Sequence, residues 1–500
     1  MDRTDPPTTG HPRRWVILAI LNLSLVLIVA SVSSLNLAIP SIQRALDASA
    51  AELVWINASY ALVFAGLLLP AGALGDRFGR KGALLNGLAI FIVAAFIATL
   101  SDSANSLIVL RGLMGVGAAL TMPATLSIIT MVFPAEERGK AIAIWSGFAG
   151  AGGAIGILAS GLLLESFWWG SVFLINVPIA ALALLLVALV VPTSKDDEQR
   201  PLDPVGSLLS ITGLVALVYG LVQGPEFGWT DPVVIGAFVM SIVFLAGWVM
   251  AELRQRDPLL DPRLFQNRQF SVAGFAITSS FLVMFGMFFV LTQYLQFALG
   301  YSALEAAVRT LPFAGTMVAV APRGPALVAR LGAGVTMSIG MFVSALGAGL
   351  LGIQDLNSGY GVIAVAIMVL AGGMALVFPA ATEAIVTSLP PSKAGVASAM
   401  NDTTREVGGA IGIALLGTLL SSGYRDGLGA VTDGLPPAAA DAAQDNVGAA
   451  LAVAAQAPEG GELLALAART AFVDGMRLAM LVGATILLVS SVVVRRLFPR

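Results

Sequence analysis

Cysteine is absent from the 500 residues, so disulfide bonds, thiolate chemistry and cysteine metal sites are excluded. The one histidine, His11, lies in the polar N-terminal segment, which rules out a histidine proton relay within a membrane. A formal net charge of −3 gives no electrostatic support for binding nucleic acid. The sequence has no GxxxxGK[ST] loop for ATP phosphates and no motif of a nucleophile, metal cluster or cofactor. We therefore expect neither an enzyme nor a cofactor.

Charged residues are also scarce. They make up 11% of the chain, whereas about a quarter is usual in a soluble domain. Hydrophobic residues make up 57% and form runs of about 20 residues, the length at which a helix crosses a bilayer core. Lipid cannot satisfy backbone polar groups, so these runs must be helical. The sequence predicts an all-α integral membrane protein with fourteen spans, at about 15–38, 53–73, 83–101, 106–131, 141–164, 170–191, 205–223, 233–251, 271–298, 304–328, 335–353, 361–387, 397–421 and 471–494.

The positive charges predict an orientation. Twenty of the 27 Lys and Arg residues lie in or beside segments on the side of the N-terminus, three lie on the other side, and four lie within spans. Basic residues collect on the cytoplasmic side of membrane proteins, so we expect a multi-pass protein of the cell membrane with both termini in the cytoplasm. The first span lacks a clear cleavage site, and we interpret it as a retained helix.

The segment GGAIGI occurs twice, at 152–157 and at 408–413, an offset of 256 residues. At the same offset Gly117 matches Gly373. We interpret the chain as two parallel six-span repeats, an arrangement that usually encloses a midplane substrate site and rocks about it. The predicted units are an N-terminal six-helix bundle at 1–191, a linker with a two-helix insert at 192–270, and a C-terminal six-helix bundle at 271–500 with a long outer loop at 423–470.

A charged loop, GALGDRFGRKGALL at 72–85, joins the second and third predicted spans. Gly72 allows two backbones to pack closely, and Gly79 permits a tight turn. Asp76 can accept hydrogen bonds from the backbone N–H groups that open a neighbouring helix. We interpret the loop as a cytoplasmic gating element, and the alternative is a basic loop that only orients the chain. Its basic members, which can pair with carboxylates or lipid phosphates, are Arg77, Arg80 and Lys81.

The spacing of this loop resembles the signature loop of the major facilitator superfamily. With fourteen spans, the chain resembles the drug:proton antiporter branch represented by the QacA and EmrB exporters. LRGLMGVGAALTMPA at 110–124 is similar to the fourth-span motif of that branch, and SGFAGAGGAIGILASGLL at 146–163 to its fifth-span motif. The resemblance covers most of the chain. It implies the major facilitator fold, with two six-helix bundles plus a two-helix insert, and transport that uses a proton gradient as its energy source.

Four charged residues inside the predicted spans are candidates for proton coupling, because charge is costly at bilayer depth and marks a functional site by default. Arg111 stands where the branch has a fourth-span arginine tied to proton coupling. Asp402, Arg405 and Glu406 are spaced i, i+3 and i+4, so they share one helix face. QacA-like exporters have acids at the matching places. The alternatives are that Arg111 snorkels outward or pairs structurally with a neighbour, and that the residues at 402–406 form an interfacial ion-pair cluster at the cytoplasmic end of the helix.

Some acids of the branch are missing. Ser31, Ala58 and Thr316 stand where related exporters carry aspartates. The sequence therefore has fewer groups that recognise cationic substrates than those exporters have. The weaker candidates for a substrate cavity are Asn36, Tyr60, Phe285, Gln293 and Glu383.

The predicted function is proton-coupled secondary active transport, in which lipophilic small molecules or drugs leave the cytoplasm by alternating access. The alternative is an exporter or flippase of an endogenous lipid or secondary metabolite, with weak or different ion coupling. A third possibility, a receptor that does not transport, lacks a supporting signalling domain in the sequence. The expected partners are a lipophilic substrate, protons and membrane lipids, with no nucleic acid, and the expected assembly is a monomer.

Overall fold

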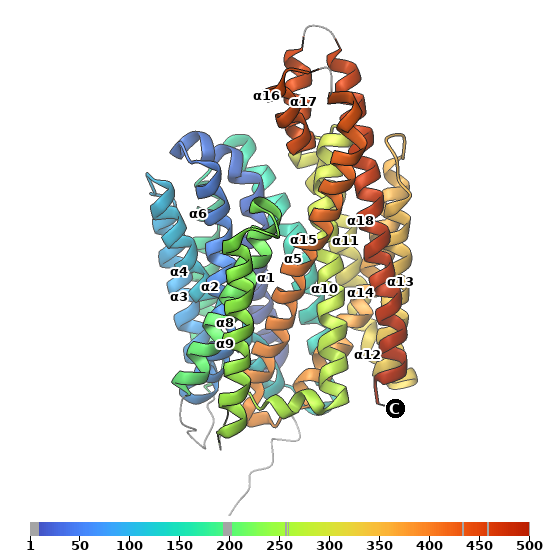
Figure 1. Ribbon diagram of the computed structural model, residues 1–500. Helices are drawn as coiled ribbons and strands as arrows, with labels where there is room; N and C mark the ends of the chain where they lie inside the picture. The colour runs from blue at the N-terminus through green and yellow to red at the C-terminus, as the bar shows by residue number, and fades with distance from the viewer. Residues whose placement is uncertain are drawn as a thin grey trace, which may run out of the picture.

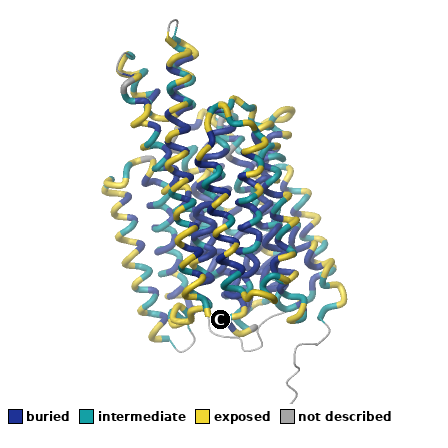
Figure 2. The backbone as a smooth tube through the Cα atoms, turned by 90° about the vertical axis from the view of Figure 1, so that its right-hand side faces the viewer, coloured by how far each residue is buried: buried dark blue, intermediate teal, exposed yellow. Residues whose placement is uncertain are grey.

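The computed structural model describes residues 10–193, 203–255, 258, 260–432, 435–457 and 460–499, and its regular structure is helical. Fourteen helical segments in these ranges are long and apolar enough to cross a membrane, which confirms the predicted number. They stand side by side in Figure 1, with the C-terminus at the lower end. Exposed positions alternate with buried ones along their length (Figure 2), and many exposed side chains are large and apolar, such as Leu189 and Ile242. Such a surface suits lipid rather than water.

The first six spans form one bundle, in which α4 packs on α2 and α3, and α5 packs on α1. The last of these spans was predicted as one helix, but it is divided between Leu174 and Asn176. Pro178, in the first turn after the break, has no backbone N–H to donate to the carbonyl oxygen of Leu174, so the helical hydrogen bonds are interrupted there. The helices are α1 (Arg14–Leu46), α2 (Ala50–Phe78), α3 (Arg80–Ala98), α4 (Ala104–Val132), α5 (Ala135–Ser166), α6 (Ser171–Leu174) and α7 (Asn176–Val190).

The last six spans form the second bundle, in which α15 packs on α10 and α18, and α13 packs on α14. The predicted span at 304–328 is interrupted, because Pro322 and Pro325 cannot continue the helical hydrogen bonds. A 3₁₀ turn, η3 (Ala321–Arg323), replaces the helix there. The other elements are α10 (Arg268–Gln293), the π-helical turn η2 (Tyr294–Ala298), α11 (Ala303–Val320), α12 (Gly324–Leu331), α13 (Ala333–Gly352), α14 (Tyr360–Thr387), α15 (Ala394–Thr432) and α18 (Gly461–Leu497).

The two-helix insert consists of α8 (Pro204–Phe227) and α9 (Pro232–Arg254). The side chains of Asp203 and Asp231 accept backbone hydrogen bonds at the starts of these helices, each at 2.8 Å from the nearest nitrogen, so both helices begin at a capping residue. α8 packs on α9, on α2 and on α15. The insert therefore lies along the side where α2 and α15 meet. A 3₁₀ turn, η1 (Pro262–Gln266), follows it and leads into α10.

The repeated GGAIGI segment has the same packing in both bundles. Gly156 of α5 lies against the backbone of Ala30 in α1, and Gly412 of α15 lies against the backbone of Leu282 in α10. A Cβ at either glycine would collide with the carbonyl oxygen of the facing helix. Glycine is required at both places because the helix backbones approach so closely.

Residues 423–470 were predicted as a long outer loop, and this prediction is wrong. α15 continues to Thr432, and α18 begins at Gly461. Between them lie α16 (Pro437–Asp445) and α17 (Val447–Gln456). These helices rise above the other spans in Figure 1. The abundant alanines of this region favour helix, whereas the prediction gave more weight to its Gly, Pro and Asp residues.

Candidate functional site

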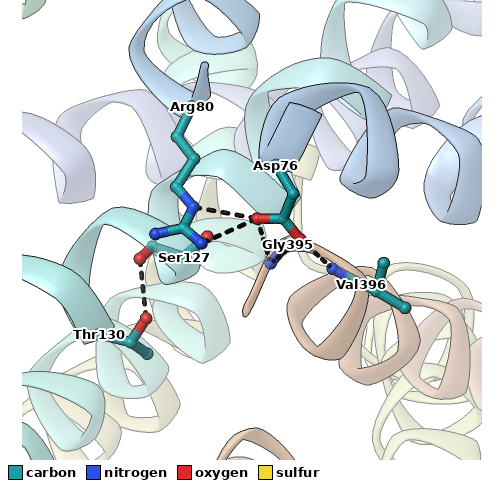
Figure 3. A network of polar contacts seen from close by, with 6 residues as sticks. All are labelled: Asp76, Arg80, Ser127, Thr130, Gly395 and Val396. Atoms are coloured by element: carbon teal, nitrogen blue, oxygen red, sulfur yellow. Dashed lines mark hydrogen bonds and ion pairs between the residues drawn. The ribbon is translucent and has the colours of Figure 1, made fainter. Parts of the chain in front are cut away.

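The motif at 72–85 lies where the two bundles meet (Figure 3). Gly79, with φ +114°, forms the turn between α2 and α3. Asp76, near the end of α2, accepts hydrogen bonds from the backbone nitrogens of Gly395 at 2.8 and 2.9 Å and of Val396 at 3.2 Å. Both nitrogens open α15, so the expected contact with a helix N-terminus is confirmed. A carboxylate there is favoured by the helix dipole.

Arg80 holds the Asp76 carboxylate from the other side. Its Nε and Nη2 each lie 3.0 Å from Asp76 Oδ1, and both side chains are buried. Gly72, one turn earlier, lies against Gly395, and a Cβ on Gly72 would come within 2.5 Å of the Gly395 carbonyl oxygen. α2 and α15 are therefore joined by a buried ionic contact and a close backbone contact.

The other two basic residues of the motif have different surroundings. The Arg77 guanidinium lies 5.2 Å from the ring centroid of Phe78. Lys81 Nζ donates to the carbonyl oxygen of Ala188 in α7 at 2.8 Å, within the first bundle. The Lys81 contact holds the loop to its own bundle, whereas Asp76 reaches the other one.

Arg111 is fully buried in α4 and interacts with α2. Its Nε donates to the carbonyl oxygen of Ile56 at 3.2 Å, and its guanidinium lies 4.5 Å from the ring centroid of Tyr60. Neither terminal nitrogen of Arg111 has a hydrogen-bond partner within the described part of the chain, and the hydroxyl of Tyr60 also has none. The site therefore holds an unbalanced cation with donors available, which agrees with the idea of a fixed charge facing a group that changes protonation.

Asp402 and Arg405 are buried in α15, and Glu406 is half-buried beside them. Asp402 Oδ1 accepts from Asn401 Nδ2 at 3.2 Å, and its Oδ2 has no partner in the described ranges. Arg405 Nη2 donates to Thr382 Oγ1 at 3.3 Å, and Thr382 donates to Asn401 at 3.0 Å. A chain of hydrogen bonds thus connects the arginine to Asp402 without a direct ion pair between them.

Two aromatic rings hold the Arg405 guanidinium. It lies 4.7 Å from the ring centroid of Trp145 in α5 and 5.1 Å from that of Phe281 in α10. Trp145 is fully buried and donates its indole N–H to Thr125 Oγ1 at 3.1 Å. Sequence analysis did not place Trp145, Phe281 or Thr382 beside Arg405. The repeat offset was one available signal for Trp145, because position 145 corresponds to Asn401, the neighbour of Asp402.

These groups lie at the junction of the bundles. Trp145 belongs to the first bundle and Arg405 to the second, so their contact crosses between the two. The Arg111 guanidinium lies over the ring of Tyr60. Glu406 interacts electrostatically with the same tyrosine. The structure therefore gathers all four candidates for proton coupling into one region between α2, α4, α5 and α15.

The candidates for a substrate cavity are more scattered. Tyr60 is buried under Arg111, and Phe285 packs on Gly409 and lies 5.8 Å from Phe281 between ring centroids. Gln293 lies at the end of α10 and donates to the carbonyl oxygen of Phe289 at 3.1 Å. Glu383 lies near the start of α5, where a Cβ on Gly139 would come within 3.0 Å of its Oε2. The side chain of Asn36 lies outside the described residues.

Comparison with known proteins identifies the class of this chain. Residues 21–413 match the Major Facilitator Superfamily, so the chain belongs to that family of secondary transporters. The multidrug efflux pump LfrA of Mycolicibacterium smegmatis is 36% identical over 99% of this chain and 98% of its own length. The tetracenomycin C resistance and export protein of Streptomyces glaucescens is 33% identical over 97% and 92%. The methyl viologen resistance protein SmvA of Salmonella typhimurium is 33% identical over 96% and 97%.

Solved structures support the major facilitator fold. The human organic anion transporter MFSD10 aligns with a TM-score of 0.64 over 97% of this chain and all of its own, at 14% identity. The proton:xylose symporter XylE aligns with a TM-score of 0.60 over 97% and 96%, also at 14% identity. The predicted fold class is therefore confirmed, and so is the resemblance to exporters of the drug:proton antiporter branch.

Proposed function

We propose that this chain exports lipophilic small molecules from the cytoplasm in exchange for protons. The observation that carries the proposal is the cluster of buried Asp402 and Arg405 with half-buried Glu406, which contacts the opposite bundle through Trp145. A carboxyl group at that junction can bind a proton while the bundles move relative to each other. The names of relatives along nearly the whole chain, which include a multidrug efflux pump and an antibiotic export protein, support the direction of transport.

In this mechanism a proton from outside binds Glu406 or Asp402 and leaves toward the cytoplasm as the bundles change orientation. The positive charge of Arg405 favours the ionised state of these acids, so it helps release the proton. Arg111 supplies a second fixed cation, whose guanidinium lies over the ring of Tyr60. The contact of Asp76 with α15 closes the end of the bundle junction where the motif loop lies, and it must break for that end to open.

The membrane orientation and the unit boundaries are part of the proposal. The excess of Lys and Arg on the side of the N-terminus supports two cytoplasmic termini in the cell membrane. The corresponding glycine contacts in α5 and α15 support division into units at 1–191, 192–270 and 271–500. We further propose that the exporter works as a monomer, because two repeats within one chain suffice to enclose a substrate site.

A second candidate is export of a neutral or anionic lipid or secondary metabolite. Three positions favour it, because none carries an acid for a cationic substrate. Ser31 is buried, Ala58 packs against Val218 of the insert, and Thr316 donates to the carbonyl oxygen of Pro312 at 2.7 Å. A panel that compares cationic dyes with neutral and anionic amphiphiles separates the two candidates: preferential transport of cations would exclude the second.

Purified protein in vesicles with an imposed pH gradient tests the coupling. We expect uphill movement of a lipophilic dye in the wild type, and a loss of at least about tenfold in Glu406→Gln and Asp402→Asn, since each variant removes a proton-binding group. Glu165→Gln, an exposed acid at the far end of α5, is the matched control and should keep full activity. Transport that is indifferent to the gradient would refute proton coupling.

A further inference from the structure

A groove opens between α1 and α5 on the membrane-facing surface. Its volume is about 450 Å³, and Trp15, Asn22 and Val26 of α1 line it opposite Phe148 and Ile155 of α5. Trp15 is 39% exposed and Ile155 is 37% exposed, so the groove is open along its length. Its α5 residues lie on a different helix face from Gly147 and Gly150, which contact α11 of the other bundle. The groove therefore faces the bilayer rather than the bundle junction.

The length of the groove matches one leaflet. From Trp15 to Val26 the helix advances 11 residues, about 16 Å at a rise of about 1.5 Å per residue. Half of a hydrocarbon core of about 30 Å is about 15 Å. A groove that starts at the N-terminal end of α1 and stops near the bilayer midplane is long enough for a single acyl chain.

The entrance of the groove is basic. Lys140 Nζ lies 5.3 Å from the ring centroid of Trp15. Arg14 is bound to Glu137, with its Nε 2.5 Å from Oε2, so those two charges compensate each other. The neighbouring Arg13 is exposed. Lys140 and Arg13 thus add positive charge where the headgroup of a lipid in this leaflet would lie.

One polar group in the groove has no partner. Asn22 is only 6% exposed, and its Oδ1 makes no hydrogen bond with the residues that the structure describes. A buried amide without a partner is costly, and an acyl chain cannot satisfy it. The unpartnered atom is the amide oxygen, an acceptor, so its partner must be a donor such as a hydroxyl of a phosphatidylglycerol headgroup.

The second bundle has a hollow at the corresponding place, which differs from the groove in its volume and in the hydrogen bonding of its polar groups. Met400 and Thr404 line it, and at the offset of 256 they correspond to Ile144 and Phe148 of the first groove. Its volume is about 170 Å³, and Gly274 lines it. The hydroxyl groups of Thr278 and Thr404 in it donate to backbone carbonyls, at 3.3 and 2.7 Å. Size and an unsatisfied polar group therefore single out the groove of the first bundle.

From these observations we infer that the groove between α1 and α5 binds one anionic glycerophospholipid from the leaflet on the side of the N-terminus. One acyl chain lies along Phe148 and Val26, and the phosphate lies at Lys140 and Arg13. The identity of that leaflet as cytoplasmic depends on the proposed orientation, but the site itself does not depend on the transported substrate.

Native mass spectrometry of the full chain, purified in detergent and titrated with phosphatidylglycerol or phosphatidylcholine, tests the inference. We expect one phosphatidylglycerol bound with preference over phosphatidylcholine. The double variant Arg13→Gln, Lys140→Gln should weaken phosphatidylglycerol binding by about 25-fold, roughly fivefold for each charge. Arg495→Gln with Arg496→Gln, two exposed charges at the end of α18, is the matched control and should bind as the wild type does.

A second variant tests the groove itself. Ala19 is exposed and lines the groove, so Ala19→Trp should fill it and remove the bound lipid while the thermal unfolding midpoint stays unchanged. Ala181→Trp, on the exposed face of α7, is the control for added bulk and should keep the lipid. Equal binding of the two lipids, or full binding in Ala19→Trp, would overturn the inference. Displacement of phosphatidylglycerol by an exported dye would instead assign the groove to substrate and also overturn it.

Discussion

At the scale of single residues, the structure shows how charge is kept within a membrane protein. Asp76 is buried, but its carboxylate accepts hydrogen bonds from two backbone nitrogens and forms an ion pair with Arg80. The Arg405 guanidinium lies against two aromatic rings and donates to one threonine hydroxyl, and it forms no ion pair with a carboxylate of the described residues. The first arrangement satisfies its charge fully, whereas the second leaves nearby acids free to bind protons. We therefore regard Asp76 as a contact that opens and closes and Arg405 as part of the coupling site.

The aromatic contacts of Arg405 lead to a prediction about shape rather than charge. Arg405→Lys keeps the positive charge but loses the planar group that lies between Trp145 and Phe281. We expect dye export in vesicles to fall by about tenfold, which corresponds to a loss of about 1.4 kcal/mol. Arg477→Lys is the control, because Arg477 forms an exposed ion pair with Asp474 at 3.3 Å. Wild-type export by Arg405→Lys would show that charge alone is sufficient.

At the scale of helices, the two GGAIGI segments predict equal effects of equal substitutions. Gly156→Val would force a side chain into the Ala30 backbone, and Gly412→Val into that of Leu282. We expect each to destabilise the protein by about 1–3 kcal/mol, as overpacking does elsewhere. Gly349→Val in α13 is the control, because no atom lies within 4 Å of a Cβ there. The thermal unfolding midpoint in detergent measures all three, and a stable Gly412→Val would contradict the packing described above.

How far the sequence predicts these elements depends on the kind of signal. Hydrophobic runs predicted all fourteen spans, because the bilayer imposes a length and a composition. The Asp76 contact was also predictable, since few partners suit a carboxylate beside a tight turn. The rings around Arg405 were not, because the sequence contains 24 phenylalanines and seven tryptophans, and only tertiary packing selects Phe281 and Trp145. The helices at 437–456 were missed because alanine-rich segments outside the membrane lack a strong hydrophobic period.

At the scale of the whole molecule, export requires the two bundles to move relative to each other. They meet chiefly along two helix pairs, α2 with α15 and α5 with α11, and α4 also packs on α15 and α5 on α14. In the second pair, Gly147 of α5 faces Ala321, which follows α11, and Gly161 faces Leu304 near the other end of the membrane. Alternating access therefore requires at least one end of this pair to separate in every cycle.

The absence of cysteine makes this requirement testable with one engineered pair. A Cβ on Gly147 would lie 3.3 Å from that of Ala321, near the roughly 3.8 Å typical of disulfides. We expect Gly147→Cys with Ala321→Cys to form an intramolecular disulfide on oxidation, to lose dye export in vesicles, and to regain it after reduction. Each single cysteine variant should export equally in both conditions, because it has no intramolecular partner. A crosslinked protein that exports at the wild-type rate would show that this end of the junction stays closed throughout the cycle, so the bundles would have to move about it as a fixed hinge.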